Sequence, residues 1–271
     1  MKGVILAGGT GSRLFPCTKV TNKHLLPVFN KPMIYYPLYS MKEAGITEVL
    51  IISGPEHAGH FLQLLGSGES LGLKISYALQ EKPGGIGQAL GLAKSFVGDD
   101  KMVVLLGDNI FENNLKPFVD EFSKKENGAM VLLKKVKNPS AYGVAVMEGE
   151  KIKLFIEKPS AFISDLAVVG LYMYDNTVFD VVKNLKPSAR GEIEIQDVNN
   201  YYLSESNIYF HEIKSFWGDC GESFEVLLDV QNYVKGSILA DIDANLTIID
   251  RSKQENLKVD SRQSSILESK N

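Results

Sequence analysis

The first residues that could do chemistry form a glycine-rich stretch near the N-terminus. A short apolar run, residues 3–7, is followed by residues 8–13, GGTGSR. Backbone N–H groups can approach an anion closely at glycine, and the guanidinium of Arg13 can bind phosphate through two parallel hydrogen bonds. Lys23 adds a second cation. The pattern predicts a phosphate-binding loop directly after a buried strand.

Two common phosphate loops do not fit this stretch. A P-loop needs GxxxxGK[ST], and no Lys-Ser or Lys-Thr follows Gly11. The dinucleotide fingerprint GxGxxG also fails, because Leu14 stands where the third glycine should be. The second failure disfavours an α/β oxidoreductase.

Two aspartates could complete a metal-assisted reaction. Asp108 follows the apolar run 101–106, and Asp219 follows Trp217-Gly218. Mg²⁺ is commonly held by one or two carboxylates together with substrate phosphates and water. With Arg13 and Lys23 they would support phosphoryl or nucleotidyl transfer. On position alone, Asp108 could instead cap a turn and Asp219 could form an Asx-turn.

Further polar residues suggest how a nucleotide and a sugar could be recognised. The Gln80 amide can both donate to and accept from the edge of a base, and Gly85 exposes its backbone groups. A glutamate accepts hydrogen bonds from hydroxyls, and a lysine can pair with phosphate. Each of these residues could also be an ordinary strand end; the sugar-site candidates are Tyr142, Gly143, Glu157 and Lys158.

Composition and missing motifs exclude several classes. A net charge of −4 argues against a nucleic-acid-binding surface. Cys17 and Cys220 lie too far apart in sequence to form a zinc pattern or a disulfide framework, and His57 and His60 have no nearby partners that complete a metal set. No GxSxG, HExxH or CxxC motif occurs. We expect neither a membrane span nor a signal peptide, and a cytoplasmic location.

The first half of the chain must position these residues by alternating strands and helices. The pattern predicts βαβ units and a mostly parallel sheet, with ligands at the carboxyl ends of the strands. The glycine loop, Gln80 and Asp108 all fall at such ends, so we expect them in one site. The expected strands are 3–7, 47–53, 73–79 and 101–106. Three helices are expected: one that ends near residue 44, one over 56–65 and one over 86–96.

The second half is richer in strands, and no Pro/Gly/Ser linker separates it from the first. We therefore expect a single domain over 1–240, with a nucleotide-binding half of about 1–128 and a sugar-binding half of about 129–240. Residues 241–271 form a short C-terminal extension whose tail we expect to be loosely ordered. The expected strands are 129–136, 144–147, 151–157, 166–175 and 208–213, and the expected helices 177–184, 194–204 and 222–235.

Taken together, these stretches resemble the sugar-1-phosphate nucleotidyltransferase family. The resemblance rests on KGVILAGGTGSRL, LLPVFNKPMIYYPL, YALQEKPGGIGQAL, LLGDN, YGV, EKP, VVGLYMYD, LKPSARGEIEIQDVN and WGDCG. It implies a Rossmann-like α/β fold, a mostly parallel central sheet flanked by helices, with an inserted sugar-binding β lobe. It also implies Mg²⁺-dependent nucleotidyl transfer from dTTP to α-D-glucose 1-phosphate, giving dTDP-glucose and pyrophosphate. UTP or another sugar 1-phosphate as substrate, and a non-catalytic nucleotide-sugar sensor, stay as alternatives.

The resemblance assigns roles residue by residue. Arg13 and Lys23 would be catalytic, with Lys23 stabilising the transferred α-phosphoryl group. Mg²⁺ would bind Asp108 and Asp219. The sugar phosphate would bind Tyr142, Gly143, Glu157, Lys158 and Val168. The nucleotide would bind Leu6, Gly8, Gly9, Thr10, Gly11, Ser12, Arg13, Lys23, His24, Gln80, Gly85 and Asp108.

Two features depart from the family pattern. His24 stands where the family usually carries Gln, so pyrimidine preference or pH dependence could differ. The resemblance also implies a homotetramer. The long bacterial enzymes have further C-terminal helices that help form a regulatory nucleotide site between subunits, and whether such a site exists here stays open.

Overall fold

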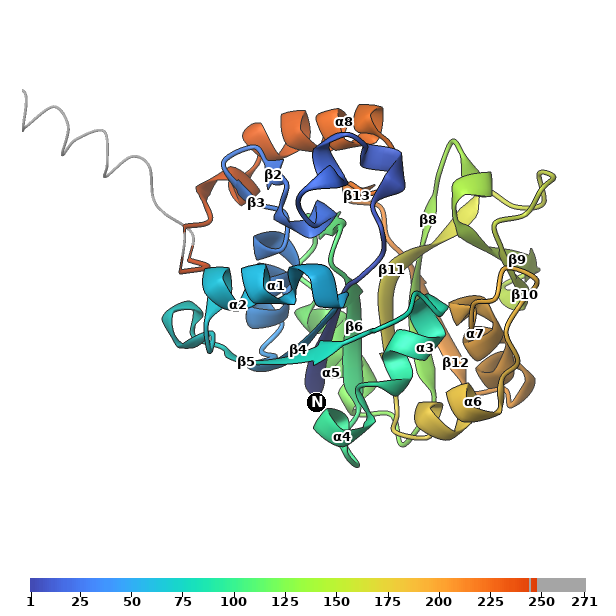
Figure 1. Ribbon diagram of the computed structural model, residues 1–271. Helices are drawn as coiled ribbons and strands as arrows, with labels where there is room; N and C mark the ends of the chain where they lie inside the picture. The colour runs from blue at the N-terminus through green and yellow to red at the C-terminus, as the bar shows by residue number, and fades with distance from the viewer. Residues whose placement is uncertain (244, 248–271) are drawn as a thin grey trace, which may run out of the picture.

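The computed structural model describes residues 1–243 and 245–247. The predicted polar tail lies outside these residues. Within them, nine strands form one sheet in the order β10-β9-β11-β6-β1-β4-β5, with β8 paired to β11 and β12 to β8 (Figure 1). The strands are β1 Lys2–Ala7, β4 Glu48–Ser53, β5 Lys74–Leu79, β6 Met102–Leu106, β8 Ala129–Lys135, β9 Gly143–Glu148, β10 Lys151–Glu157, β11 Leu166–Tyr174 and β12 Ile208–Glu212.

The sheet is mostly parallel, as predicted. β1 runs parallel to β4 and β6, and β4 runs parallel to β5. Only β10 and β11 run against the other strands of this described sheet. Because β11 pairs directly with β6, the sheet continues without a break from the first half of the chain into the second.

Helices cover both faces of the sheet. Alternate residues of β1 enter different cores: Ile5 belongs to the cluster packed by α1, α2, α5 and α8, and Val4 to the cluster packed by α3, α4, α6 and α7. Burial on both faces is why β1 is a continuous apolar run. The helices are α1 Tyr35–Glu43, α2 Ala58–Leu65, α3 Gly85–Gly91, α4 Lys94–Val97, α5 Lys116–Ser123, α6 Val178–Asn184, α7 Ile195–Ser204 and α8 Phe224–Lys235.

The structure differs from the sequence predictions in four places. The helix predicted over 86–96 is divided into α3 and α4, with Gly91, a poor helix former, at the break. The short helix α5 was not predicted. Two small ribbons were also missed: β2 Pro27–Val28 with β3 Lys31–Pro32, and β7 Asn109–Phe111 with β13 Trp217–Asp219. Strands this short carry no periodic signal, but the second ribbon is essential to the site.

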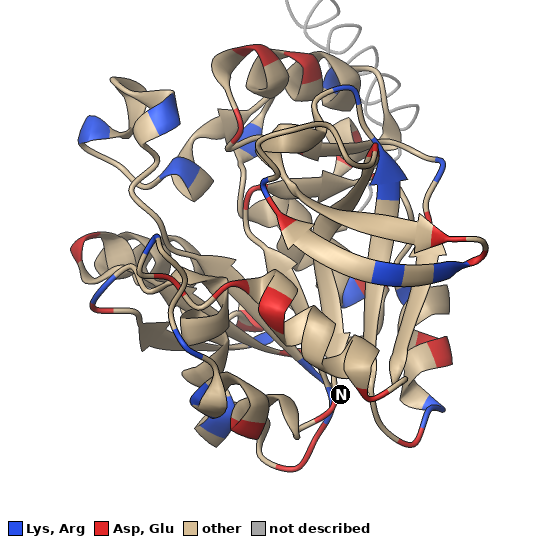
Figure 2. Ribbon diagram, turned by 90° about the vertical axis from the view of Figure 1, so that its right-hand side faces the viewer, with Lys and Arg blue, Asp and Glu red and all other residues tan. Residues whose placement is uncertain are grey.

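Basic and acidic residues are interspersed over the face that Figure 2 shows. Among the described residues, no helix combines the length and the apolarity needed to cross a membrane.

Candidate active site

The glycine loop is held in place by side chains that follow it in sequence. The Asn22 amide donates to the Ala7 carbonyl (3.1 Å), at the end of β1, and the Thr18 hydroxyl donates to the Gly11 carbonyl (2.7 Å). Gly9 and Gly11 have φ angles of +90° and +61°, where a side chain would be strained. The loop therefore depends on glycine at these two positions.

Lys23 is placed by the same asparagine. Asn22 caps a 3-10 turn, Lys23–Leu25, by accepting a hydrogen bond from the His24 N–H (2.9 Å). From this turn the Lys23 ammonium reaches the Asp108 carboxylate and forms a largely buried ion pair. Burial alone would lower the pKa of Lys23, but the carboxylates of Asp108 and Asp219 hold it above its usual value. Burial opposes ionisation of Asp108 too, yet the attraction of Lys23 holds its pKa well below the usual range.

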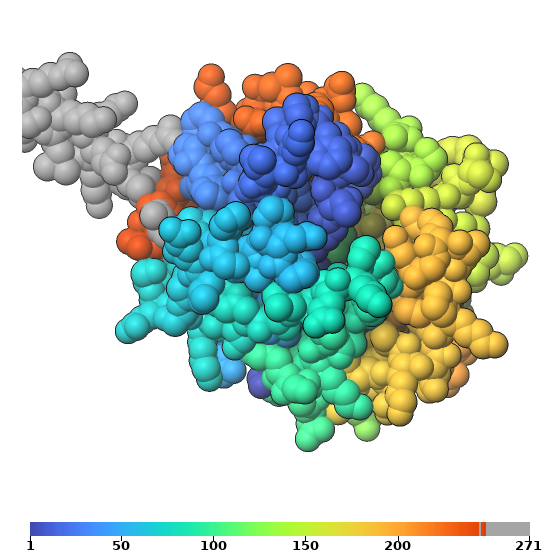
Figure 3. Space-filling view, viewed as in Figure 1, coloured from blue at the N-terminus to red at the C-terminus, as the bar shows by residue number. Residues whose placement is uncertain are grey.

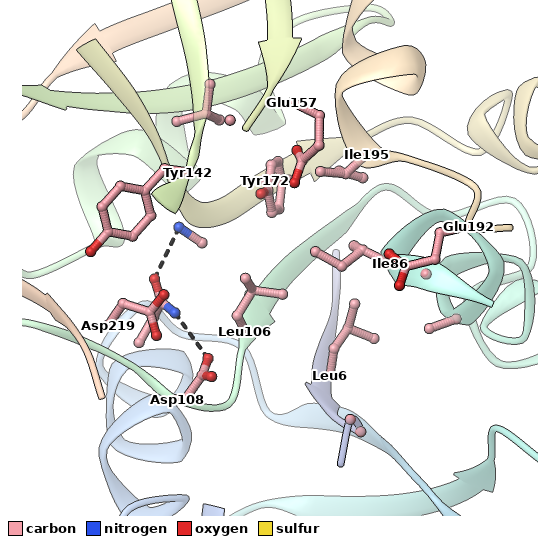
Figure 4. A pocket seen from close by; sticks show the side chains of 18 of the residues that line it. Leu6, Ile86, Leu106, Asp108, Tyr142, Glu157, Tyr172, Glu192, Ile195 and Asp219 are labelled. Atoms are coloured by element: carbon pink, nitrogen blue, oxygen red, sulfur yellow. Dashed lines mark hydrogen bonds between the residues drawn. The ribbon is translucent and has the colours of Figure 1, made fainter. Parts of the chain in front are cut away.

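The ribbon of β7 and β13 brings Asp219 to the same place. Its register pairs Asp219 with Asn109, the neighbour of Asp108. The Asn109 amide donates to Asp108 (3.0 Å), and its oxygen accepts from the Gly170 N–H (3.1 Å) and the Trp217 indole (2.7 Å). Figure 4 shows the side chains of Asp108 and Asp219 close together at one end of the cavity.

The two carboxylates carry more negative charge than Lys23 balances. Burial and the nearby Asp108 charge raise the pKa of Asp219 to about 7. A divalent cation would relieve this repulsion, and carboxylate oxygens are ligands that Mg²⁺ favours. Within the described part of the chain, no group of three or more His, Cys, Asp or Glu could hold a metal by itself. The pair therefore suits an ion whose remaining ligands are substrate phosphates and water.

Gly221 leaves room for this arrangement. Its N–H donates to the Asp219 carboxylate (2.9 Å). A Cβ at this position would lie 2.2 Å from the Asp108 carboxylate oxygen and 2.9 Å from the Lys23 nitrogen. Only glycine therefore fits at this position without displacing the ion pair.

The opposite side of the cavity carries the candidate base reader. The Gln80 Nε2 group donates to the Gly85 carbonyl (3.1 Å) and to the Gln88 side chain (2.7 Å). Its oxygen faces Gly8, where a Cβ would lie 3.0 Å away. With its donor engaged inside the protein, Gln80 presents chiefly an acceptor.

Four of the sugar-site candidates lie on or directly beside the hairpin of β9 and β10, and the fifth, Val168, lies on β11. Gly143 pairs with Glu157 in the antiparallel ladder, and the Lys158 N–H donates to the Tyr142 carbonyl (3.0 Å). Burial raises the pKa of Glu157. The Tyr142 ring packs edge-on against Trp217, with ring centroids 5.3 Å apart. This contact joins the hairpin to the strand that carries Asp219.

These residues surround one cavity of about 270 Å³. Figure 3 shows the molecule hollowed between the N-terminal loop, the α3 region and the residues around α7. Every residue predicted for the site lines the cavity except Thr10, Gly11 and Ser12, which lie in the loop outside it. The cavity also includes residues that sequence reasoning missed, among them Asn109, Tyr172, Glu192, Ile195, Gln196 and Trp217.

His24 lines the cavity but exposes little of itself to it. The residue is 1% exposed, and its Nδ1 atom lies 2.6 Å from the Asn22 side-chain oxygen. Its edge lies so close to Gly107 that a Cβ there would be 2.7 Å from the ring. Burial, together with the charge of Lys23, lowers the pKa of His24 to about 3. The imidazole is therefore neutral near pH 7.

Replacing His24 with Gln should flatten the pH dependence of stability. A neutral buried histidine stabilises the fold fully above its unfolded pKa of about 6.5, and this contribution is lost as the pH falls towards about 3. The free energy of unfolding of the wild type should therefore fall by up to about 1.4 kcal/mol per pH unit below pH 6.5 through this group alone. Urea denaturation at pH 7, 6 and 5 measures it. His60→Gln, which replaces an exposed histidine of α2, is the control. A His24→Gln slope equal to the wild-type slope would contradict the prediction.

The sheet, its glycine loop and the cations and carboxylates at one edge define an α/β enzyme that acts on nucleotide phosphates. The chain belongs to the nucleotidyl transferase family, whose model matches residues 2–236. It is 45% identical over 210 residues to the glucose-1-phosphate thymidylyltransferase of Neisseria meningitidis, covering 77% of this chain and 73% of that protein. The family and fold predicted from the sequence are thus confirmed.

Solved structures agree with this assignment. A crystal structure from Bacillus anthracis, assigned there to a glucose-1-phosphate thymidylyltransferase and containing sucrose, is 49% identical and superposes with a TM-score of 0.84 over 88% of this chain and 96% of its own. A UDP-glucose pyrophosphorylase in complex with UDP-glucose is 26% identical, with a TM-score of 0.77 over 87% of this chain and 99% of its own.

Proposed function

We propose that the protein transfers a thymidylyl group from dTTP to α-D-glucose 1-phosphate, with Mg²⁺, giving dTDP-glucose and pyrophosphate. One observation carries the proposal. Lys23, Asp108 and Asp219 lie together in a cavity that also contains Gln80, the candidate base reader, and Glu157, the candidate sugar ligand. The identity to glucose-1-phosphate thymidylyltransferases supports the choice of substrates. From the family resemblance we also propose that the protein is cytoplasmic and forms a homotetramer.

In this proposal each residue has a distinct role. The glycine loop and Arg13 bind the triphosphate, and Lys23 stabilises the charge that develops on the α-phosphoryl group as a sugar-phosphate oxygen attacks in line. Asp108 and Asp219 would hold Mg²⁺, which neutralises phosphate charge when bound. Pyrophosphate leaves from the side opposite the attacking oxygen. Lys158 would pair with the phosphate of the incoming sugar.

The side-chain oxygen of Gln80 can accept a hydrogen bond from the imide N–H of a pyrimidine base. Thymine and uracil share this group, so Gln80 alone does not separate dTTP from UTP. UTP use is therefore the second candidate function. The similarity to a UDP-glucose pyrophosphorylase, at 26% identity, gives it less support than the thymidylyltransferases give to dTTP. A non-catalytic sensor is disfavoured because Arg13, Lys23 and both aspartates are intact.

A pyrophosphate-release panel tests the proposal. dTTP, UTP, CTP, ATP and GTP are each combined with several sugar 1-phosphates and Mg²⁺. We expect the highest kcat/KM for dTTP with glucose 1-phosphate, the pair named by the thymidylyltransferases that the chain resembles. The Gln80 acceptor should disfavour CTP, which has no imide N–H, and the Glu157 carboxylate can accept from sugar hydroxyls. Faster turnover with UTP would replace the substrate assignment. If the folded protein released no pyrophosphate with any combination of nucleotide and sugar 1-phosphate, the enzymatic role would be overturned.

A further inference from the structure

A buried chain of side-chain hydrogen bonds runs behind the sugar end of the cavity. The Tyr174 hydroxyl donates to the Asn199 side-chain oxygen (2.6 Å), and the Asn199 Nδ2 group donates to the Gln196 oxygen (3.0 Å). The exposures of these residues are 0%, 0% and 2% for Tyr174, Asn199 and Gln196. The bond from Asn199 fixes the Gln196 oxygen on this side, so the amide presents its two N–H donors on the other side.

Those donors face the pair of residues at the start of β9 and the end of β10. A Cβ on Gly143 would lie 2.1 Å from the Gln196 nitrogen, so the amide rests directly on the glycine backbone. Gly143 is the ladder partner of Glu157, so the Gln196 amide that lies against Gly143 faces the same side of the hairpin as the Glu157 side chain. Burial raises the pKa of Glu157, and the nearby Gln196 donor opposes that rise. In Figure 4, Glu157 lies at this end of the cavity, close to Ile195, which directly precedes Gln196.

Helix α7 is fixed on β10 by a separate contact. The Asn200 side chain accepts from the Phe155 N–H (2.9 Å) and donates to the Phe155 carbonyl (2.8 Å). β10 is the last strand of the sheet on this side, so Asn200 takes the place of a neighbouring strand. Phe155 is two residues before Glu157 on β10, and Asn200 is on the same helix as Gln196. The two bonds therefore fix the position of Gln196 along β10 relative to the Glu157 carboxylate.

Two cations compete for the same carboxylate from outside. Arg190 lies 3.5 Å and Lys158 3.8 Å from the Glu157 Oε1 atom. Neither is at hydrogen-bonding distance, and both have partly exposed side chains. Without a donor on its buried side, Glu157 would be free to turn towards them.

We propose that Gln196 is a positioning residue for the sugar subsite: it holds Glu157 so that the remaining lone pairs of the carboxylate accept hydrogen bonds from the hydroxyls of the sugar 1-phosphate. This inference rests on the proposed function. Gln196 does not itself bind the nucleotide, so its effect falls on one substrate alone.

Gln196→Met tests the proposal, because methionine keeps the length of the side chain and removes its donors. We expect KM for glucose 1-phosphate to rise about tenfold, since a hydrogen bond to a charged group is lost. KM for dTTP should stay within about twofold, because the nucleotide end is untouched. Tyr174→Phe should give a smaller rise in the same KM, since Asn199 then loses the donor that orients it.

Tyr202→Phe is the matched control. It removes a hydroxyl from the adjacent ring, 5.7 Å from Tyr174 between centroids, but that hydroxyl donates to Asp175 (2.9 Å) and not to Asn199. It should leave both KM values unchanged. The same rise in sugar KM for Tyr202→Phe and Tyr174→Phe, or equal changes in both KM values for Gln196→Met, would reduce the chain of bonds to a structural role. An inactive wild type would instead refute the proposed function.

Discussion

Replacing Asp108 with Asn should lower kcat for pyrophosphate release by at least about a hundredfold, the size of effect expected when one charged group is lost from a polar transition state. Asparagine has nearly the same shape but no charge. Asp219 would then face the metal alone, and Lys23 would lose its closest partner. The required Mg²⁺ concentration should rise as well, which a Mg²⁺ titration of the rate measures.

Stability must be followed in the same experiment. Removing one partner of a buried ion pair costs about 3–5 kcal/mol, and we expect less here because Asp219 remains near Lys23. Asp175→Asn is the matched control, because Asp175 is also buried at a strand end but bonds Thr177 and Tyr202 outside the cavity. We expect it to lower Tm and to keep kcat. Unchanged turnover of a folded Asp108→Asn variant would remove Asp108 from the metal site.

Replacing Lys23 with Ala should also lower kcat about a hundredfold or more, with a much smaller rise in KM for the nucleotide. The reason is that Lys23 is held by the two carboxylates before substrate binds, so its charge is ready where the transferred phosphoryl group gains charge. Steady-state kinetics at saturating Mg²⁺ separates kcat from KM.

The loss of Lys23 also affects metal binding, and this effect must be separated from the effect on kcat. It leaves Asp108 and Asp219 together without a cation, which changes metal affinity. A Mg²⁺ titration of each variant corrects for this, and Lys23→Arg, which keeps the charge but not the position, serves as the comparison. A loss confined to nucleotide KM, with kcat intact, would make Lys23 a ground-state binder only.

The sequence predicted much of the site because its signals are local. Parallel strands end at the same edge of a sheet, so the glycine loop after β1, Gln80 after β5 and Asp108 after β6 had to lie together once the alternating pattern was read. The continuous apolar run of β1 indicated burial on both faces of that strand. That much follows from periodicity and from the position of polar residues at strand ends.

Other contacts depend on packing between distant segments. Asp219 reaches Asp108 through a ribbon of two three-residue strands, and strands this short have no recognisable periodicity. Asn109 joins its neighbour Asp108 to Gly170 and Trp217, which lie 61 and 108 residues further along the chain. Gly221 has its role only because the ion pair lies against its backbone.

The sequence by itself determined which chemical groups this protein has, and that most of them meet at one edge of a parallel sheet. Only the tertiary structure decided how they are oriented: that Lys23 is paired with Asp108, that His24 is buried and neutral, and that Gln196 lies behind Glu157. The physical reason is range. Strand and loop patterns are set by neighbours along the chain, whereas ion pairs, buried amides and pKa values are set by side chains that only folding brings together.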